Sequence, residues 1–268
     1  MSITESSRSL VAAIALAVAA SLVVTGCAPT PEPSPEPSAE TGLLTGSITV
    51  FAAASLTQTF EQLAEEFEAE HPGIEITLSF AGSSDLVAQL IEGAPADVFA
   101  SANEANMTKL VDAGLAVGEP TVFATNVLEI AVPPGNPAGI TDFASLAAPE
   151  LRLVVCAEAV PCGAATAAIE AATGVVLTPV SEENSVTDVL GKVASGEADA
   201  GLVYETDVLG ADGAVDGIAF PESAEAVNRY PIVQVAGSEH SVLADAFIAY
   251  ILGPVGAAAL AAAGFGTP

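Results

Sequence analysis

Small residues and hydroxyl groups recur in this sequence where predicted strands meet predicted helices. The four junctions are Ala53-Ala54-Ser55, Ala81-Gly82-Ser83-Ser84, Pro161-Cys162-Gly163 and Asn184-Ser185-Val186. In doubly wound α/β sheets, ligands bind outside the carboxyl ends of the strands, where the following helices point their N-termini at the ligand. Hydroxyls and free backbone amides at such places bind anions. We therefore expect an oxyanion site at these junctions, while helix capping is the alternative role for each serine taken alone.

Positive charge is scarce in the chain. Its 268 residues include 5 Lys and Arg against 34 Asp and Glu, which gives a net charge of −29. Such a surface repels phosphate backbones and anionic lipids, which excludes nucleic acid and charged membrane surfaces as main partners. An oxyanion must then be held by neutral donors and helix dipoles. A site made only of hydrogen-bond donors would also select between oxyanions. HPO₄²⁻ carries a proton that needs an acceptor, whereas a fully deprotonated dianion carries no such proton.

Motifs for catalysis or for metal binding find little support. The sequence has no G-x-S-x-G, P-loop or G-x-G-x-x-G pattern, and His71 and His240 lack the spacing of a metal motif. A hydrolase that used Ser83 or Cys162 would need a base within reach, and no histidine is nearby. A ferric-ion binder would need clustered tyrosines. The three tyrosines are separate in the sequence, at Tyr204, Tyr230 and Tyr250. We expect a binding protein that is not an enzyme and has no cofactor.

The N-terminus has the features of an export signal. Residues 10–24 are an apolar run that follows Arg8, and the run is shorter than the roughly 20 residues that span a bilayer. It ends in Val24-Thr25-Gly26-Cys27, which resembles the lipobox of bacterial lipoproteins. We expect residues 1–26 to be a signal peptide and Cys27 to carry lipid. The protein would then be extracytoplasmic and attached to the cell membrane by the lipid anchor alone.

After the signal, composition separates a tether from the folded part. Residues 29–40 read PTPEPSPEPSAE, which cannot form a core and favours extended conformations. We assign residues 27–46 to this tether. In an exported chain Cys156 and Cys162 would lie where a disulfide persists, and we expect them to form one. Two reduced thiols are the alternative.

Strand patterns and helix patterns alternate from residue 47 onward. The predicted strands are 48–51, 74–80, 97–101, 126–132, 151–156, 177–180, 200–204 and 230–235. Helices are predicted after most of them, and two more lie on either side of Gly253-Pro254. Ser55 to Gln58 has the spacing of a capping box, and Ser83 or Ser84 is expected to cap the next helix. Strands separated by helices predict mostly parallel sheets flanked by helices.

The chain resembles a known family in seven motifs that occur in the family's order. They are FAAASL (51–56), FAGSSDL (80–86), GAPADVFASA (93–102), VPCG (160–163), GLVYETD (201–207), YPI (230–232) and GFG (264–266). Together they are similar to the molybdate-binding proteins of bacterial molybdate ABC importers. The resemblance covers the whole predicted folded part.

The resemblance implies a fold and a site. The fold is the two-lobed, type II periplasmic-binding-protein fold, with residues 47–123 and 230–268 in one lobe and residues 124–229 in the other. The family holds its oxyanion by hydrogen bonds alone. Its ligand residues correspond to the hydroxyls of Ser55, Ser83 and Tyr204 and to the backbone amides of Cys162 and Val186.

The resemblance also implies a function. The protein would capture molybdate, and also tungstate, and deliver it as a monomer to the membrane permease of an ABC importer. Molybdenum would enter only as part of the oxyanion. A binder of sulfate or of another tetrahedral oxyanion is the alternative.

Overall fold

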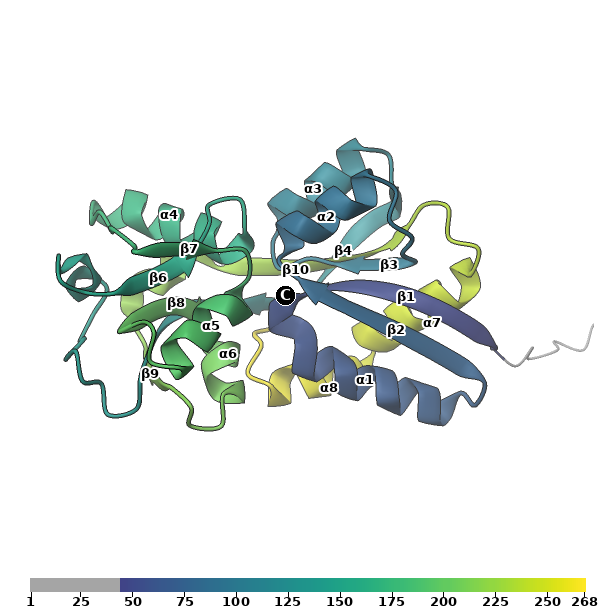
Figure 1. The fold of residues 1–268 in the computed structure, drawn as a ribbon. Coiled ribbons are helices and arrows are strands. Elements are labelled where there is room, and N and C mark those ends of the chain that lie inside the picture. The colour runs from purple at the N-terminus through teal and green to yellow at the C-terminus, as the bar shows by residue number, and fades with distance from the viewer. Residues whose placement is uncertain (1–43) are drawn as a thin grey trace, which may run out of the picture. The chain divides into compact units, whose positions relative to one another are not determined.

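Two five-stranded sheets, each flanked by helices, make up the fold of residues 44–268, which are the residues described by the computed structural model (Figure 1). The first sheet has the order β2-β1-β3-β10-β4 and the second has the order β7-β6-β8-β5-β9. The predicted signal peptide, the lipidation of Cys27 and all but the last residues of the tether lie outside the described residues. The α/β fold with two sheets agrees with the prediction.

The strands and helices have the following bounds. The strands are β1 (Gly46–Ala53), β2 (Ile74–Ala81), β3 (Val98–Ala100), β4 (Ala116–Asn126), β5 (Leu128–Val132), β6 (Leu153–Cys156), β7 (Ser181–Glu183), β8 (Ala200–Tyr204), β9 (Asp216–Ile218) and β10 (Asn228–Val235). The α-helices are α1 (Thr57–Glu70), α2 (Ser83–Ile91), α3 (Glu104–Asp112), α4 (Pro161–Thr173), α5 (Val186–Ala194), α6 (Glu205–Gly210), α7 (Ser241–Leu252) and α8 (Pro254–Ala262). Three 3₁₀ turns complete the list: η1 (Ala54–Leu56), η2 (Ala144–Ala147) and η3 (Pro221–Ala226).

Both sheets are mixed. In the first, β1 pairs in parallel with β2 and β3, whereas β10 is antiparallel to β3 and β4. In the second, β6 pairs in parallel with β7 and β8, whereas β5 is antiparallel to β8 and β9. Half of the pairings are therefore antiparallel, more than the mostly parallel sheets that the sequence predicts. The antiparallel strands are those next to the points where the chain passes between the sheets.

The chain passes between the two sheets along two neighbouring paths. It leaves the first sheet at the end of β4 and enters the second at β5, with one residue between the two strands. It returns at the start of β10, where Asn228 pairs with Asn126 of β4. The predicted lobe boundaries, at 123/124 and 229/230, fall inside these two strands. Because the two paths are hydrogen-bonded to each other, they act as one connection between the sheets.

Apolar side chains fill both faces of the first sheet. The helix α1 buries Phe60, Leu63 and Phe67, which have the three- and four-residue spacing of one helix face. The Phe60 and Phe67 rings meet Phe247 of α7 edge to face, at centroid distances of 6.4 and 5.5 Å. On the opposite face, α2 and α3 contribute a second apolar cluster that includes Leu110. The sheet is therefore covered on both sides.

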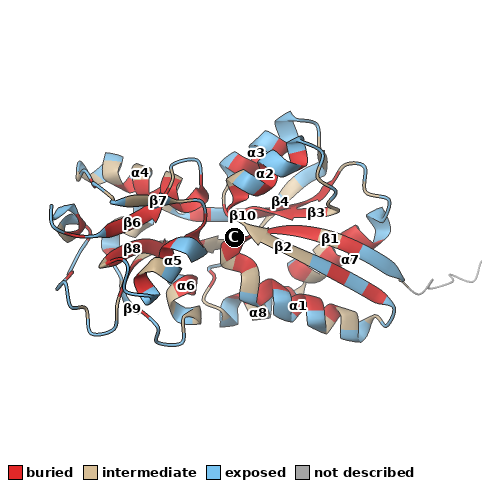
Figure 2. Cartoon of the chain, in the orientation of Figure 1, coloured by how far each residue is buried: buried red, intermediate tan, exposed pale blue. Residues whose placement is uncertain are grey.

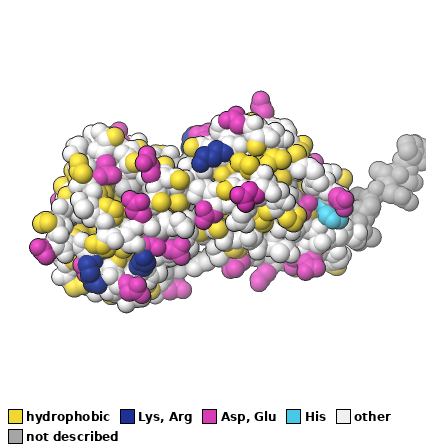
Figure 3. Space-filling model, turned by 45° about the horizontal axis from the view of Figure 1, so that its top comes forward, with side chains coloured by type: hydrophobic (Ala, Val, Ile, Leu, Met, Phe, Trp, Pro, Cys, Tyr) yellow, Lys and Arg dark blue, Asp and Glu magenta, His cyan; other side chains and the backbone are white. Residues whose placement is uncertain are grey.

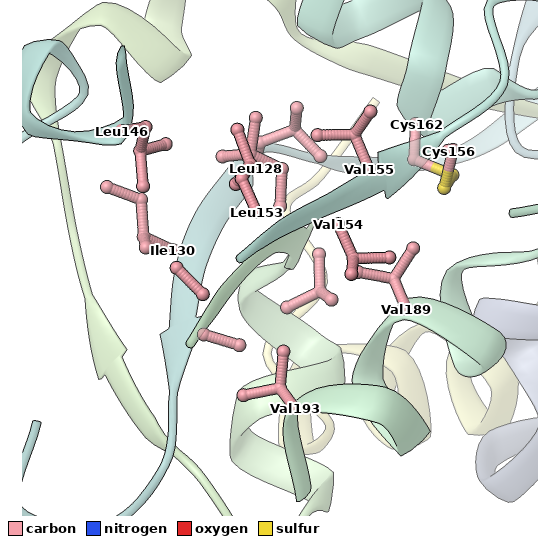
Figure 4. Close-up of a cluster of buried hydrophobic side chains, with 14 of the residues drawn as sticks. Leu128, Ile130, Leu146, Leu153, Val154, Val155, Cys156, Cys162, Val189 and Val193 are labelled. Carbon is pink, nitrogen blue, oxygen red and sulfur yellow. A yellow bond between two sulfur atoms is a disulfide. The ribbon is translucent and has the colours of Figure 1, made fainter. Parts of the chain in front are cut away.

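The second sheet has its own core. Strands β5 and β6 contribute Leu128, Ile130 and Leu153, and α5 contributes Val189 from the covering layer (Figure 4). The central strands of both sheets are buried, and the helices expose their outer faces (Figure 2). Each sheet can thus hold its own strand ends in place.

Four elements differ from those that the sequence predicts. The strand β4 was not predicted, since Gly118 and Pro120 normally interrupt a strand. It tolerates them because it is an edge strand whose register against β10 shifts twice. The predicted strand at 177–180 is wrong: Val180 is 64% exposed, and the strand that pairs with β6 is β7, at Ser181–Glu183. The short elements α6 and β9 were also not predicted.

Within residues 44–268, no single helix has the length and hydropathy of a membrane span, and only the bent pair of α7 and α8 passes that test together.

A disulfide joins Cys156 at the end of β6 to Cys162 in the first turn of α4 (Figure 4). Their Cα atoms are 5.6 Å apart. Both side chains are buried. A Cβ on Gly163, the next residue, would lie 2.0 Å from the carbonyl oxygen of Ala157, so the turn closes only with glycine there. The bridge and this glycine fix the start of α4 against the strand before it.

Replacing Cys156 and Cys162 together by alanine should lower the free energy of unfolding by about 2 kcal/mol, the loop-closure entropy of so short a ring. Urea unfolding measures the loss. The parent protein with a reductant is the matched control, because it breaks the bridge without changing a side chain, and it should lose a similar amount. Two free thiols in the denatured, unreduced parent would contradict the bridge.

Candidate functional site

Strand ends from both sheets surround one small cavity of about 10 Å³. The first sheet lines it with the residues that follow β1, β2 and β3, and the second with those around the starts of α4, α5 and α6. The lining residues are Ala53, Ala54, Ser55, Gly82, Ser83, Ala102, Val160, Pro161, Cys162, Val186 and Tyr204. Sites for drug-sized organic molecules measure ~300–1,000 Å³. The cavity is therefore on the scale of a small ion.

All five residues predicted as oxyanion ligands line this cavity: Ser55, Ser83, Cys162, Val186 and Tyr204. They are spread over almost 150 positions of the sequence, and the two sheets bring them together. The arrangement is the one expected at the carboxyl ends of strands in α/β folds.

The hydroxyl of Ser83 is oriented by the backbone. The side chain is 1% exposed, and its Oγ accepts a hydrogen bond of 3.0 Å from the N–H of Ala102. With that lone pair occupied, the hydroxyl proton is free to donate into the cavity. The prediction that a serine caps α2 is wrong: Gly82 is the N-cap residue, and no side chain caps the helix.

The hydroxyl of Ser55, like that of Ser83, makes its hydrogen bond with a residue outside the following helix. It lies in the 3₁₀ turn η1, and the turn and α1 both begin without a side-chain cap, so the predicted capping box does not form. Its Oγ lies 3.0 Å from the phenol oxygen of Tyr230. The hydroxyl is thus held by a buried side chain instead of by its own helix.

Two helices present backbone amides to the cavity. Cys162 is the second residue of α4, after Pro161, and Val186 is the first residue of α5. Amides in the first turn of a helix have no acceptor within that helix, and the helix dipole adds partial positive charge there. The N-cap residue of α5, Ser185, accepts from the N–H of Asp188 and so fixes the start of that helix. These two helix starts are suited to bind an anion.

The phenol of Tyr204 is the most exceptional polar group of the site. Its side chain is 1% exposed, and its oxygen makes no hydrogen bond of good geometry with the described residues, although Tyr230 and Asn228 lie near it. Burial raises the pKa of Tyr204 well above its usual value, so the phenol keeps its proton. A buried hydroxyl without a partner is costly, which marks this one as a donor for a ligand.

Tyr204 and Tyr230 lie side by side, with ring centroids 6.0 Å apart, which corrects the expectation that the tyrosines are not paired. The pair still does not make a ferric site. Burial raises the pKa of both phenols, whereas Fe³⁺ requires phenolate. No group of three His, Cys, Asp or Glu residues able to hold a metal occurs in the part of the chain that the structure describes.

No charged side chain lines the cavity within residues 44–268. The Lys and Arg residues there have partners elsewhere: Lys109 donates to Asn106, Arg152 pairs with Asp199, Lys192 pairs with Glu183, and Arg229 lies 3.7 Å from Glu104. Acidic side chains are spread over the surface that Figure 3 shows. Any ion in the cavity is bound by neutral donors.

The nearest buried carboxyl group belongs to Asp207, in the first turn of α6. Its Oδ2 accepts a hydrogen bond of 2.8 Å from the N–H of Tyr204. Burial raises the pKa of Asp207 to about 7. Asp207 lines a second, larger cavity of about 510 Å³, which shares Ala54 and Ser55 with the first. Because Asp207 and Asp212 line that larger cavity, it suits an oxyanion less well.

Three residues important to the site were not predicted as such. Gly82 lies so close to the other sheet's residues that a Cβ on it would be 2.0 Å from the carbonyl oxygen of Asn184. Ala102 orients Ser83, and Tyr230 contacts Ser55. The motifs FAGSSDL, GAPADVFASA and YPI contain all three, but their roles depend on contacts between distant segments.

The whole folded part matches a protein family. Residues 48–266 match the model of the family described as "Bacterial extracellular solute-binding protein". This chain belongs to that family. The chain is 50% identical over 219 residues to the "Molybdate-binding protein ModA" of Mycobacterium tuberculosis (strain ATCC 25618 / H37Rv), covering 82% of this chain and 84% of the relative.

Two further matches span most of the chain. The solved structure of the Azotobacter vinelandii periplasmic molybdate-binding protein aligns with a TM-score of 0.72 at 26% identity, over 82% of this chain and 99% of that one. The "Sulfate-binding protein" of Synechococcus elongatus is 25% identical, over 81% of this chain and 72% of the relative. The two-lobed fold is thereby confirmed, as is the prediction of a binding protein that is not an enzyme and needs no cofactor.

Asp207 should make the stability of this solute-binding protein fall as pH rises. Its pKa is raised in the folded state, so the folded state binds the proton more tightly than the unfolded state. The cost of its ionisation therefore accumulates between about pH 4 and pH 7 and is complete above that range. Asp207→Asn should accordingly raise the melting temperature more at pH 8 than at pH 5.

Asp212→Asn, which removes an exposed carboxylate in the turn after α6, is the control for this comparison. Thermal unfolding followed by circular dichroism at both pH values makes the measurement. An equal effect of Asp207→Asn at the two pH values would contradict the raised pKa.

Proposed function

We propose that this solute-binding protein captures molybdate in the small cavity, through Ser55, Ser83, Cys162, Val186 and Tyr204. The observation that carries the proposal is a cavity on the scale of an ion, lined by neutral donors, with the unpaired phenol of Tyr204 among them. The relative that is 50% identical is named a molybdate-binding protein, and so is the Azotobacter structure. Geometry and relatives therefore support the same ligand.

In this proposal three hydroxyls and two amides replace the water around the ion. Ser55, Ser83 and Tyr204 donate O–H groups, and Cys162 and Val186 donate N–H groups. A hydrogen bond to a charged group contributes about 1.5–3 kcal/mol, roughly twice a neutral one. The dipoles of α4 and α5 add favourable charge at the same place. Together, these hydrogen bonds and helix dipoles offset the repulsion between the anion and a chain of net charge −29. Salt screens that repulsion over about 8 Å.

Selectivity follows from a site that only donates. Hydrogen phosphate carries a proton that needs an acceptor, while molybdate carries none and can accept from every group that the site orients as a donor. Tungstate has the same charge and shape as molybdate, and we propose that it binds too. Sulfate is smaller and would leave some donors out of reach. Binding of sulfate is the second candidate, because one relative is named a sulfate-binding protein.

We further propose that residues 47–123 with 230–268, and residues 124–229, act as two lobes that close on the ion. The paired strands β4 and β10 would form the hinge, since the chain passes between the sheets there. The loaded monomer would deliver molybdate to the permease of an ABC importer. Unchanged molybdate uptake in cells that lack the chain would contradict delivery.

Ser83→Ala should weaken molybdate binding roughly ten- to a hundredfold, the loss of one charge-assisted hydrogen bond. Calorimetric titration of the mature protein with molybdate, tungstate, sulfate and phosphate measures it. Ser84→Ala is the matched control, because this neighbouring hydroxyl does not line the cavity, and it should leave the affinity unchanged. Equal affinities of the parent for sulfate and molybdate would contradict the proposal.

We also propose that Cys27 is the lipidated N-terminus of the mature protein, on the basis of the sequence around it. A single acyl chain binds a membrane only marginally, whereas the several chains of a bacterial lipoprotein hold stably. Cys27→Ser should therefore move the protein from the membrane fraction to the soluble fraction, as followed by immunoblotting of fractionated cells. A variant that stayed with the membrane would contradict the anchor.

A further inference from the structure

The hydroxyl of Ser55 lies between the cavity and a phenol that does not reach the cavity. Ser55 lines the cavity and Tyr230 does not. The two oxygens are 3.0 Å apart, and geometry alone allows either to be the donor. An oxyanion without protons removes this ambiguity. Ser55 has one proton, and if that proton goes to the ion, the hydrogen bond to Tyr230 requires the phenol to donate.

Tyr230 is held firmly in place. Its side chain is fully buried, and it lies on β10, one of the two strands that connect the sheets. Its ring packs edge to face against Phe123 and Phe265, at centroid distances of 6.3 and 5.4 Å, and lies 6.0 Å from the ring of Tyr204. Burial raises the pKa of Tyr230 above its usual value, so the proton stays on the phenol. Tyr230 is therefore rigid and keeps a proton that it can donate to Ser55.

Ser83 repeats the same arrangement with a different donor. Its Oγ accepts from the N–H of Ala102, which can only donate. With Tyr230 as the donor to Ser55, each of the two serines of the cavity has a donor on its far side. Two hydroxyls on different strand ends of one sheet are oriented in the same sense, with their protons toward the cavity.

We propose that Tyr230 is a positioning residue that sets the specificity of the site: by donating to Ser55 Oγ, it occupies one of the two lone pairs of that oxygen and turns the serine proton toward the ion. The inference rests on the proposed oxyanion function and adds to it the reason why the serine behaves as a donor. It also names a residue outside the cavity as a source of selectivity.

The consequence is a difference between two kinds of anion. Molybdate accepts only, so it gains from a serine whose proton is fixed toward it. Hydrogen phosphate must also donate one proton, and the serine Oγ accepts it more readily when the phenol is gone, because both lone pairs are then free and the hydroxyl can turn. Removing the phenol oxygen therefore weakens molybdate binding and makes Ser55 a better acceptor for hydrogen phosphate.

The test is a double-mutant cycle on the full mature chain, with Tyr230→Phe, Ser55→Ala and the double variant. Calorimetric titration with molybdate, and with phosphate in mildly alkaline solution, gives the affinities. Tyr230→Phe should weaken molybdate binding about three- to tenfold in the parent. In the Ser55→Ala background it should change the affinity by less than about twofold, because its effect passes through Ser55. Tyr230→Phe should reduce the ratio of molybdate affinity to phosphate affinity in the parent, where Ser55 is present, and should leave that ratio unchanged in the Ser55→Ala background.

Tyr250→Phe is the matched control, because it removes a phenol oxygen from α7, where Tyr250 packs against Phe67. It should leave both affinities unchanged, and melting temperatures verify that each variant is folded. An equal loss of molybdate affinity from Tyr230→Phe with and without Ser55, or an unchanged preference over phosphate, would overturn the positioning role alone. A parent protein that does not bind molybdate would instead overturn the proposed function on which the inference rests.

Discussion

An oxyanion that enters a buried cavity loses its water, and each of its oxygens must then find a donor in the protein. In this chain the donors are neutral, since the Lys and Arg residues of the described part are paired elsewhere. Neutral donors are weak one at a time, so several must converge within one small space. Strand ends followed by helix starts are the places where a fold supplies such groups together. The rest of the structure holds these ends against each other.

The contact between the two sheets is built for this convergence. Asn228 of β10 donates to the carbonyl oxygen of Ala102 at 2.8 Å and, more weakly, to that of Pro161 at 3.5 Å, so one side chain joins the two halves of the site. Gly82 and Asn184 approach so closely that a side chain on residue 82 would separate them. The smallest residue at that junction is a requirement of the approach, because the backbones themselves form the contact.

The large negative charge and the proposed anion site are compatible because they act over different distances. Surface carboxylates contribute a field that salt screens within about one Debye length. The donors act at hydrogen-bond distance inside a space without charged side chains. Asp207 is the nearest buried carboxyl group, and its raised pKa of about 7 keeps it protonated below that pH. While it is protonated, it places no negative charge beside the cavity. Burial thus reduces the one local charge that would oppose the ligand.

The sequence by itself determined the class of fold and most of the elements, because hydrophobic periodicity and the residues at helix starts are local features. Four of the five candidate residues lie at the predicted strand-to-helix junctions, whereas the full set with Tyr204 came from the resemblance to molybdate-binding proteins. The sequence predicted β8 at 200–204 and the start of α5 after Ser185, where burial and a side-chain cap agree with the local pattern. It missed β4, since only pairing with β10 makes a strand of a segment with Gly118 and Pro120.

Only the tertiary structure decided which partners the serines have. Their spacing is also that of helix caps, but Ser83 is contacted by Ala102, which follows β3, and Ser55 is contacted by Tyr230 of β10. The direction of a hydroxyl proton is set by partners across the fold, so no local pattern could reveal it.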